Sequence, residues 1–132
     1  MLLNEGDEHD VLSAIDLYRA GDYLKIRSLN VSDAVICKII QEKPELKDYI
    51  LNIRKLSPEV LDLIAREGDD SLKRRISAKY PLLRRTYEFL AQQSDGVKIA
   101  LCSNKKLPED IRKELASNGS RFVKQFIKEN NL

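Results

Sequence analysis

The chain has 132 residues, of which 42% are hydrophobic and 33% are charged, and its formal net charge is +2 at pH 7. This apolar content is enough to bury one hydrophobic core and excludes a chain that is disordered throughout. No stretch reaches the roughly 20 apolar residues that a membrane-spanning helix needs, and the start turns acidic from Glu5 onward, unlike a secretory signal. We therefore expect a cytoplasmic protein with no membrane partner.

The first predicted element follows an acidic segment, residues 6–10, which contains the single histidine, His9. A metal site needs several histidine or cysteine ligands at fixed spacing, so this segment is interpreted as a helix-capping start rather than a metal site. Residues 11–29 are a degenerate copy of the repeat described next. We expect Tyr18 and Tyr23 to pack in a capping core, because the first unit of a repeat array is atypical.

A repeat of 25 to 26 residues then runs to the end of the chain, with units that begin at Val31, Leu56, Leu82 and Leu107. Within each unit, apolar residues recur at a spacing of four, four and one, and after a polar break they recur at a spacing of four. This is one face of a helix, because residues three and four apart lie on the same side. The positions after the break are filled by Leu46, Leu72, Val97 and Phe122, and four residues later by Ile50, Ile76, Leu101 and Phe126.

Each unit therefore predicts two short helices. In the second unit we expect one from Pro58 to Glu67, with Ser57 as its N-cap, and one from Leu72 to Lys79. Helices this short are marginal alone, but stacked pairs bury their apolar stripes against their neighbours. We predict an all-α fold, a right-handed α-solenoid of short helix pairs with repeats of about 25 residues. It forms a single repeat domain over 1–132, with a degenerate N-terminal cap at 1–30 and units at 31–55, 56–81, 82–106 and 107–132.

The segments LSPEVLDLIAREGDDSLKRRISAKY and LPEDIRKELASNGSRFVKQFI resemble bacterial leucine-rich repeat variants, and more loosely HEAT-type α-solenoids. The resemblance covers about residues 30–130 and implies a repeat architecture used for binding, without naming the ligand. The chain departs from the family pattern where the closing Val-Arg pair is Val97-Lys98 and the closing Leu-Ala pair is Leu101-Cys102.

No catalytic set is recognisable in the sequence. Because His9 is the single histidine, no second histidine can serve as a base for Cys37 or Cys102. Both cysteines lie on apolar stripes, so we interpret them as small buried hydrophobic residues. Glycine-rich phosphate-binding loops are absent. We expect a protein that is not an enzyme and uses no cofactor and no metal.

Charged residues gather at the breaks between helices, where a stacked array would align them along two edges. The acidic positions are Asp22, Glu42, Glu45, Asp69, Asp70 and Asp95. The basic positions are Arg54, Lys55, Lys79, Lys105 and Lys106, and a second basic cluster is Lys73, Arg74, Arg75, Arg84 and Arg85. Acids at helix starts and bases at helix ends also complement the helix dipole, at about 0.3–1 kcal/mol each, and the basic cluster can equally be a solvated face.

The leading hypothesis is a protein-binding solenoid, and its sharpest form is a bacterial immunity protein that inhibits a cognate toxin, for example a nuclease. Acidic edges could cover a basic cleft of such an enzyme. The alternative is a nucleic-acid binder that uses residues 53–132, which carry 17 basic and 11 acidic side chains. Interspersed acids weaken it, and Tyr80 and Tyr87 are the only nearby aromatic residues for base stacking. A detached module of a larger enzyme is a third alternative.

Overall fold

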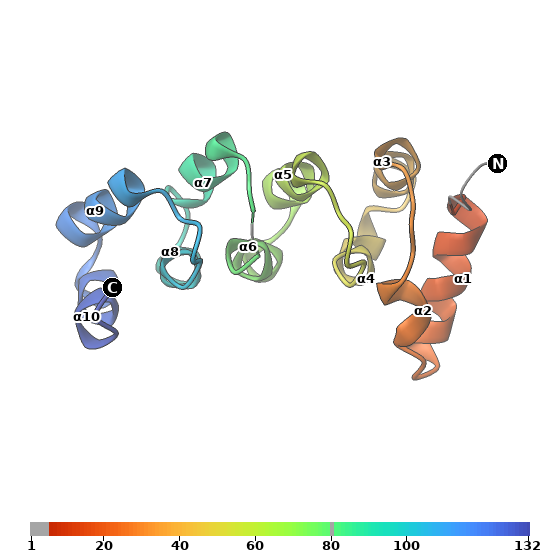
Figure 1. The fold of residues 1–132 in the computed structure, drawn as a ribbon, viewed down its shortest axis with the longest axis horizontal. Coiled ribbons are helices and arrows are strands. Elements are labelled where there is room, and N and C mark those ends of the chain that lie inside the picture. Colours follow the sequence, from red (N-terminus) through yellow and green to blue (C-terminus); the bar gives the residue numbers. More distant parts are fainter. Residues whose placement is uncertain (1–5, 80) are drawn as a thin grey trace. The chain divides into compact units, whose positions relative to one another are not determined.

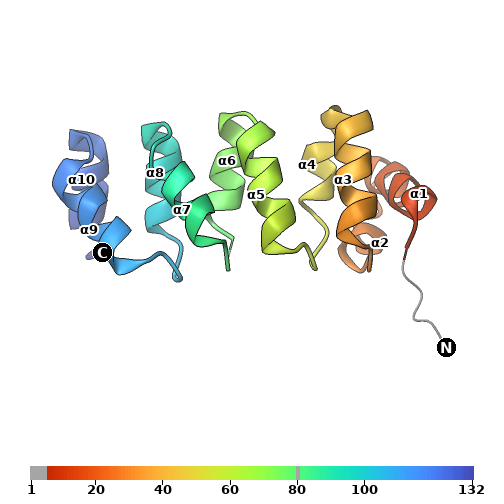
Figure 2. The same cartoon turned by 90° about the horizontal axis from the view of Figure 1, so that it is seen from above.

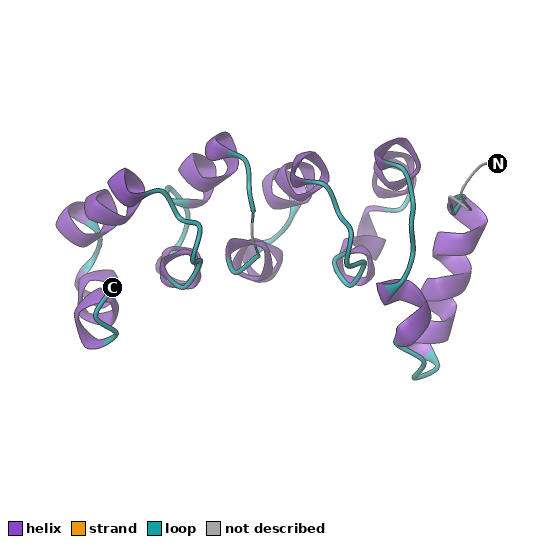
Figure 3. Cartoon of the chain, viewed as in Figure 1, coloured by secondary structure: helices purple, strands orange, loops and turns teal. Residues whose placement is uncertain are grey.

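The computed structural model describes residues 6–79 and 81–132, and this part of the chain is built from helices and loops (Figure 3). Apart from one isolated bridge between Gly6 and Val31, the described residues form no β-structure. The predicted all-α class is therefore confirmed. The chain divides into two compact units, residues 1–60 and 61–132.

The first unit contains four helices and a 3-10 turn among its described residues. They are α1 (Glu8–Arg19), α2 (Leu24–Arg27), α3 (Asp33–Glu42), η1 (Pro44–Leu46) and α4 (Lys47–Ile50). Helix α1 begins with a capping box in which the Asp7 carboxylate accepts from the Asp10 N–H at 3.0 Å and the Asp7 N–H donates to the Asp10 carboxylate at 2.9 Å. The hydrogen bond from the Asp10 backbone holds the pKa of Asp7 below its usual value. The predicted helix-capping role of the acidic segment is confirmed.

The core of the first unit is formed by aliphatic side chains from all of these helices. Those that are at most 1% exposed are Val11, Ala14, Ile15, Ile26, Ile36, Ile39, Ile40 and Ile50. Ile39 and Ile50 occupy positions that the repeat pattern assigned to the apolar face. Helix α1 packs against α2, α3 and α4, so the core lies between α1 and the remaining helices of this unit.

Six further helices follow, beginning with α5, which spans the boundary between the units. They are α5 (Pro58–Glu67), α6 (Asp70–Ser77), α7 (Arg84–Leu90), α8 (Asp95–Cys102), α9 (Glu109–Asn118) and α10 (Arg121–Glu129). Within the second unit, α6 packs on α8 and α8 packs on α10. These three helices lie in one layer, and α7 and α9 lie in a second layer (Figures 1 and 2).

Helix α5 has the bounds that the sequence predicted, and the Ser57 hydroxyl caps it by accepting from the Val60 N–H at 3.1 Å. Helix α6 begins and ends two residues earlier than predicted. The reason is its cap: the Asp69 carboxylate accepts from the Leu72 N–H at 2.9 Å, so the helix begins at Asp70.

The helix caps also set which residues face the core of the second unit. Asp69, Ser94 and Ser120 each accept from the backbone N–H three residues later, and those residues, Leu72, Val97 and Val123, are buried. The prediction that Phe122 and Phe126 are the core residues of the last unit was therefore wrong by one position. Phe122 is 62% exposed, because the cap of α10, Ser120, lies 13 residues after the start of its unit at Leu107, whereas the cap of α8, Ser94, lies 12 residues after Leu82.

Candidate partner-binding surface

The acidic residues predicted for the second unit hold helix ends together. Asp69 caps α6, as described above. The carboxylate of Asp70, the first residue of α6, accepts from the hydroxyl of Ser94, the N-cap of α8. Asp95 accepts from Ser120, the N-cap of α10, at 2.8 Å. The partners are 24 and 25 residues apart, so these carboxylates connect equivalent positions of successive repeats and have an internal structural role.

Replacing Ser120 with alanine is expected to lower the free energy of unfolding by about 1–2 kcal/mol. The substitution removes both the cap of the Val123 N–H, now bonded at 3.3 Å, and the link to Asp95. Urea denaturation followed by circular dichroism measures the effect. Ser117→Ala is the control, since Ser117 is exposed and its side chain forms no hydrogen bond with another described residue. It should change stability by less than about 0.5 kcal/mol. Equal stability of the two variants would contradict the structural role.

The predicted basic cluster is also engaged within the second unit. Arg84 forms a bidentate pair with Asp110 and a further pair with Glu88 at 3.3 Å, which raises its pKa above the usual value. Arg74 pairs with Asp70 at 2.8 Å. Lys73 donates to the Gly68 carbonyl at 2.6 Å. Arg75 is exposed and also takes part in a contact.

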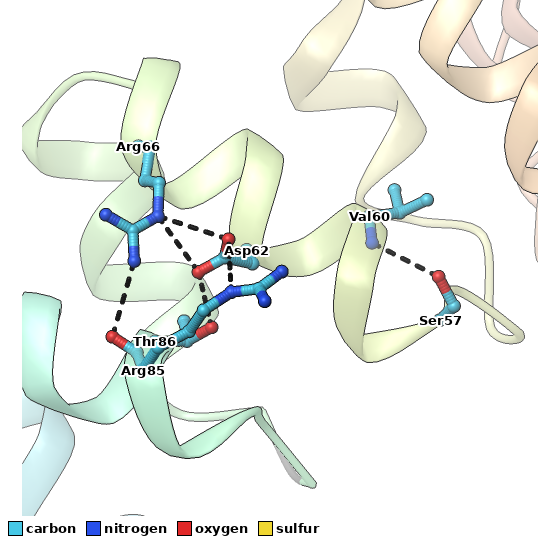
Figure 4. Close-up of polar contacts among 6 residues, drawn as sticks. All are labelled: Ser57, Val60, Asp62, Arg66, Arg85 and Thr86. Carbon is cyan, nitrogen blue, oxygen red and sulfur yellow. Dashed lines mark hydrogen bonds and ion pairs between the residues drawn. The ribbon is translucent and has the colours of Figure 1, made fainter.

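Asp62 is the acceptor at the centre of a charge cluster that the sequence analysis did not single out (Figure 4). Asp62 is 6% exposed, and its carboxylate accepts from the Thr86 hydroxyl at 2.6 Å. The Nε atoms of Arg66 and Arg85 donate to it at 3.1 and 3.3 Å. Burial alone would raise the pKa of Asp62, but the hydrogen bonds from Thr86 and Arg66, the charge of Arg66 and the hydrogen bond from Arg85 together lower it. Arg85, predicted to face a partner, is therefore tied to α5.

The three acidic residues predicted in the first unit are exposed to solvent. Asp22 accepts from the Leu24 N–H at 3.2 Å, which shapes the turn before α2. Glu42 ends α3, and Glu45 lies in the 3-10 turn beside a pocket of about 350 Å³. In contrast to Asp70 and Asp95, the carboxylates of Glu42 and Glu45 accept no hydrogen bond from another described repeat.

Exposed apolar side chains lie close in sequence to those acids, at the corner where α1 ends and α2 begins. Leu17 is 41% exposed, Tyr23 is 50% exposed and Leu24 is 74% exposed. The prediction that Tyr23 packs in a capping core was wrong, because its ring lies on the surface at 4.7 Å from Tyr18, edge to face. The ring of Tyr49 lies 5.7 Å from that of Tyr18, also edge to face. We call Leu17, Tyr23 and Leu24 the apolar corner.

A basic edge in the second unit is held in place by a buried asparagine. Asn104 donates to the carbonyls of Ser77 and Lys79, and its own carbonyl accepts from the Lys106 N–H at 2.8 Å. Burial lowers the pKa of Lys79, and the charge of Arg75 lowers it further. Tyr87 is 3% exposed and cannot stack on a base, and Tyr80 lies outside the described residues.

Within residues 6–79 and 81–132, no three His, Cys, Asp or Glu side chains gather in a group suited to a metal ion. None of the helices there is both long and apolar enough to cross a membrane. Cys37 and Cys102 are not joined by a disulfide. Cys102 is buried, as predicted, and burial raises the pKa of its thiol, whereas Cys37 is half-buried.

The described chain is thus an all-helical protein in which polar side chains connect residues about 25 positions apart. The chain matches no family model, no curated protein and no solved structure.

Proposed function

We propose that this chain is a non-catalytic, protein-binding α-solenoid of the leucine-rich repeat variant type. The observation that carries the proposal is the apolar corner, where three large side chains, Leu17, Tyr23 and Leu24, lie exposed within eight residues. Exposed apolar side chains grouped with polar neighbours are typical of protein interaction sites. The links between residues 24 to 26 apart, such as Ser94 to Asp70 and Arg84 to Asp110, support the stacked arrangement of repeats.

Protein is favoured over nucleic acid as the partner because three arginines of the predicted basic cluster already have carboxylate partners. Arg74, Arg84 and Arg85 form ion pairs with Asp70, Asp110 and Asp62. A phosphate backbone would have to compete with these pairs. Tyr23 at the corner suits a protein surface, since tyrosine is enriched among the few desolvated residues that supply most of the binding energy at such interfaces.

The sharper form of the proposal is a bacterial immunity protein that inhibits a cognate toxin. Exposed carboxylates near the apolar corner support it, since Asp22 immediately precedes Tyr23 and Leu24. Such carboxylates would complement a basic catalytic cleft, for example that of a nuclease, and accelerate association with it. In this form the partner is an enzyme, and its activity falls when it is mixed with an equal concentration of this chain.

The double variant Leu17→Ser/Leu24→Ser is expected to weaken the partner complex at least tenfold without changing thermal stability, because both side chains are exposed in the free protein. The partner is sought as the product of the adjacent gene and by co-purification from the source cells. Binding is measured by titration calorimetry, and inhibition by an assay of the partner's activity.

Phe122→Ser is the matched control, since Phe122 is 62% exposed but lies on α10 in the second unit. It should change the affinity less than twofold. The proposal fails if no protein co-purifies with the native chain, or if the control weakens the complex as much as the double variant.

A further inference from the structure

Two arginines share a surface pocket of about 310 Å³ in the first unit. The pocket is lined by Leu24, Arg27, Ser28 and Arg54. Arg27 is the last residue of α2, and Arg54 lies in the loop after α4. Their backbones are joined directly, because the Arg54 N–H donates to the Arg27 carbonyl at 3.3 Å. The two guanidinium groups are therefore attached to neighbouring points of the same wall.

Neither guanidinium group forms an ion pair or a hydrogen bond with another described residue, in contrast to Arg66, Arg74, Arg84 and Arg85. Two unpaired like charges in one pocket repel each other, and an anion bound between them would remove that repulsion. A guanidinium group binds a carboxylate through two parallel hydrogen bonds. The pocket thus has the charge and the donors for an acidic group.

Leu24 adds an apolar contact to the same pocket. It is 74% exposed, and it also belongs to the apolar corner. The Ser28 hydroxyl donates to the backbone carbonyls of Leu24 and Lys25. The two arginines therefore supply the donors for an anion in this pocket. An occupant that covers Leu24 must carry an apolar group next to its negative charge.

We infer that Arg27 and Arg54 receive a glutamate or aspartate side chain of the partner protein, while Leu24 packs against an aliphatic residue beside it. This inference rests on the proposed protein-binding function and names the chemistry of the bound segment. A phosphate group would satisfy the arginines equally well, but the sugars that flank it in a nucleic-acid backbone are polar and cover Leu24 less well than an aliphatic side chain does. The site therefore selects an acidic and aliphatic peptide segment.

The test uses the full chain and three fluorescein-labelled probes followed by anisotropy. They are a decapeptide of alternating leucine and glutamate, its leucine–glutamine counterpart and an oligouridine of ten nucleotides. We expect the acidic peptide to bind at least tenfold more tightly than the glutamine peptide. The double variant Arg27→Gln/Arg54→Gln should abolish this preference, and Leu24→Ser should weaken both peptides.

Lys105→Gln/Lys106→Gln is the matched control, because it removes the same two charges from exposed residues of the second unit. It should change the affinity for the acidic peptide less than twofold, and circular dichroism should show that both double variants keep the native helix content. The inference is overturned if the two peptides bind equally, if both double variants lose the same affinity, or if oligouridine binds more tightly than the acidic peptide and depends on Arg27 and Arg54. If the peptides are not distinguished while the partner complex still depends on Leu17 and Leu24, the pocket assignment fails and protein binding stands.

Discussion

Replacing Asn104 with alanine is expected to lower the free energy of unfolding by about 3–4 kcal/mol, the largest effect of any single polar substitution that we propose. Asn104 is fully buried in the second unit. Its amide nitrogen donates to the carbonyls of Ser77 and Lys79, and its oxygen accepts from the Lys106 N–H and from the Tyr87 hydroxyl at 3.4 Å. Alanine would remove all four bonds, and those with the Ser77 carbonyl and the Tyr87 hydroxyl are buried.

The size of this effect follows from the number of groups that lose their bonds. A buried donor or acceptor left unsatisfied costs about 1–3 kcal/mol, whereas a satisfied neutral hydrogen bond contributes only about 1 kcal/mol. The loop between α8 and α9 would also lose its connection to the end of α6, so we expect the basic edge at Lys79 and Lys106 to become more mobile. Hydrogen exchange of the Lys106 amide should rise in the variant.

Asn118→Ala is the control for Asn104→Ala in urea denaturation. Asn118 is the last residue of α9 and is exposed, so its replacement should change stability by less than about 0.5 kcal/mol. A destabilisation of Asn104→Ala below 1 kcal/mol would show that water or a shifted backbone satisfies the Ser77 and Lys79 carbonyls. In that case the buried asparagine would not be what holds the two loops together.

The spacing of apolar residues in the sequence was sufficient to predict the helices, the apolar face of each helix and several core positions. The helix from Pro58 to Glu67 was predicted with the correct bounds because proline and a capping serine mark its start. In the last unit, the residues that face the core can be identified only from the position of the helix cap. Counting three residues on from Ser120 leads to the buried Val123, whereas alignment of apolar residues alone led to the exposed Phe122.

The candidate site could be predicted only in part, because a charge at a helix end has the same sequence signature whether it faces solvent or a neighbouring repeat. The period itself contained a usable signal: Asp62 and Thr86 are 24 residues apart, as are Asp70 and Ser94. Searching for acid and donor pairs at that separation would have identified the internal links. The exposure of Leu24 had no such signal, since leucine at a helix start is equally compatible with a core.

The Asp62→Asn variant is expected to be less stable than the native protein by about 2–3 kcal/mol at pH 7, and this difference should shrink as the pH falls. The asparagine side chain can still accept from Thr86, but its amide group cannot accept from both Arg66 and Arg85. The native carboxylate is buried, so the hydrogen bonds it accepts are worth more than those of an exposed ion pair.

The direction of the pH dependence follows from the lowered pKa of Asp62 in the folded protein. The unfolded chain takes up the proton at a higher pH than the folded chain does, near the ordinary aspartate pKa of 3.8. The stabilisation by the carboxylate is therefore complete above that pH and is lost as the pH falls through the folded-state pKa. Below it, the protonated Asp62 resembles the asparagine of the variant, and the two proteins should approach the same stability.

Urea denaturation of both proteins at a series of pH values from 7 to 2 measures this difference directly. Asp110→Asn provides the comparison, because Asp110 also has a lowered pKa beside Arg84 but its side chain is 65% exposed. Its pH-dependent contribution should be the smaller of the two, since solvent and salt screen an exposed pair. A difference between the native protein and Asp62→Asn that stays constant from pH 7 to 2 would mean that the charge of Asp62 does not hold α5 against the start of α7.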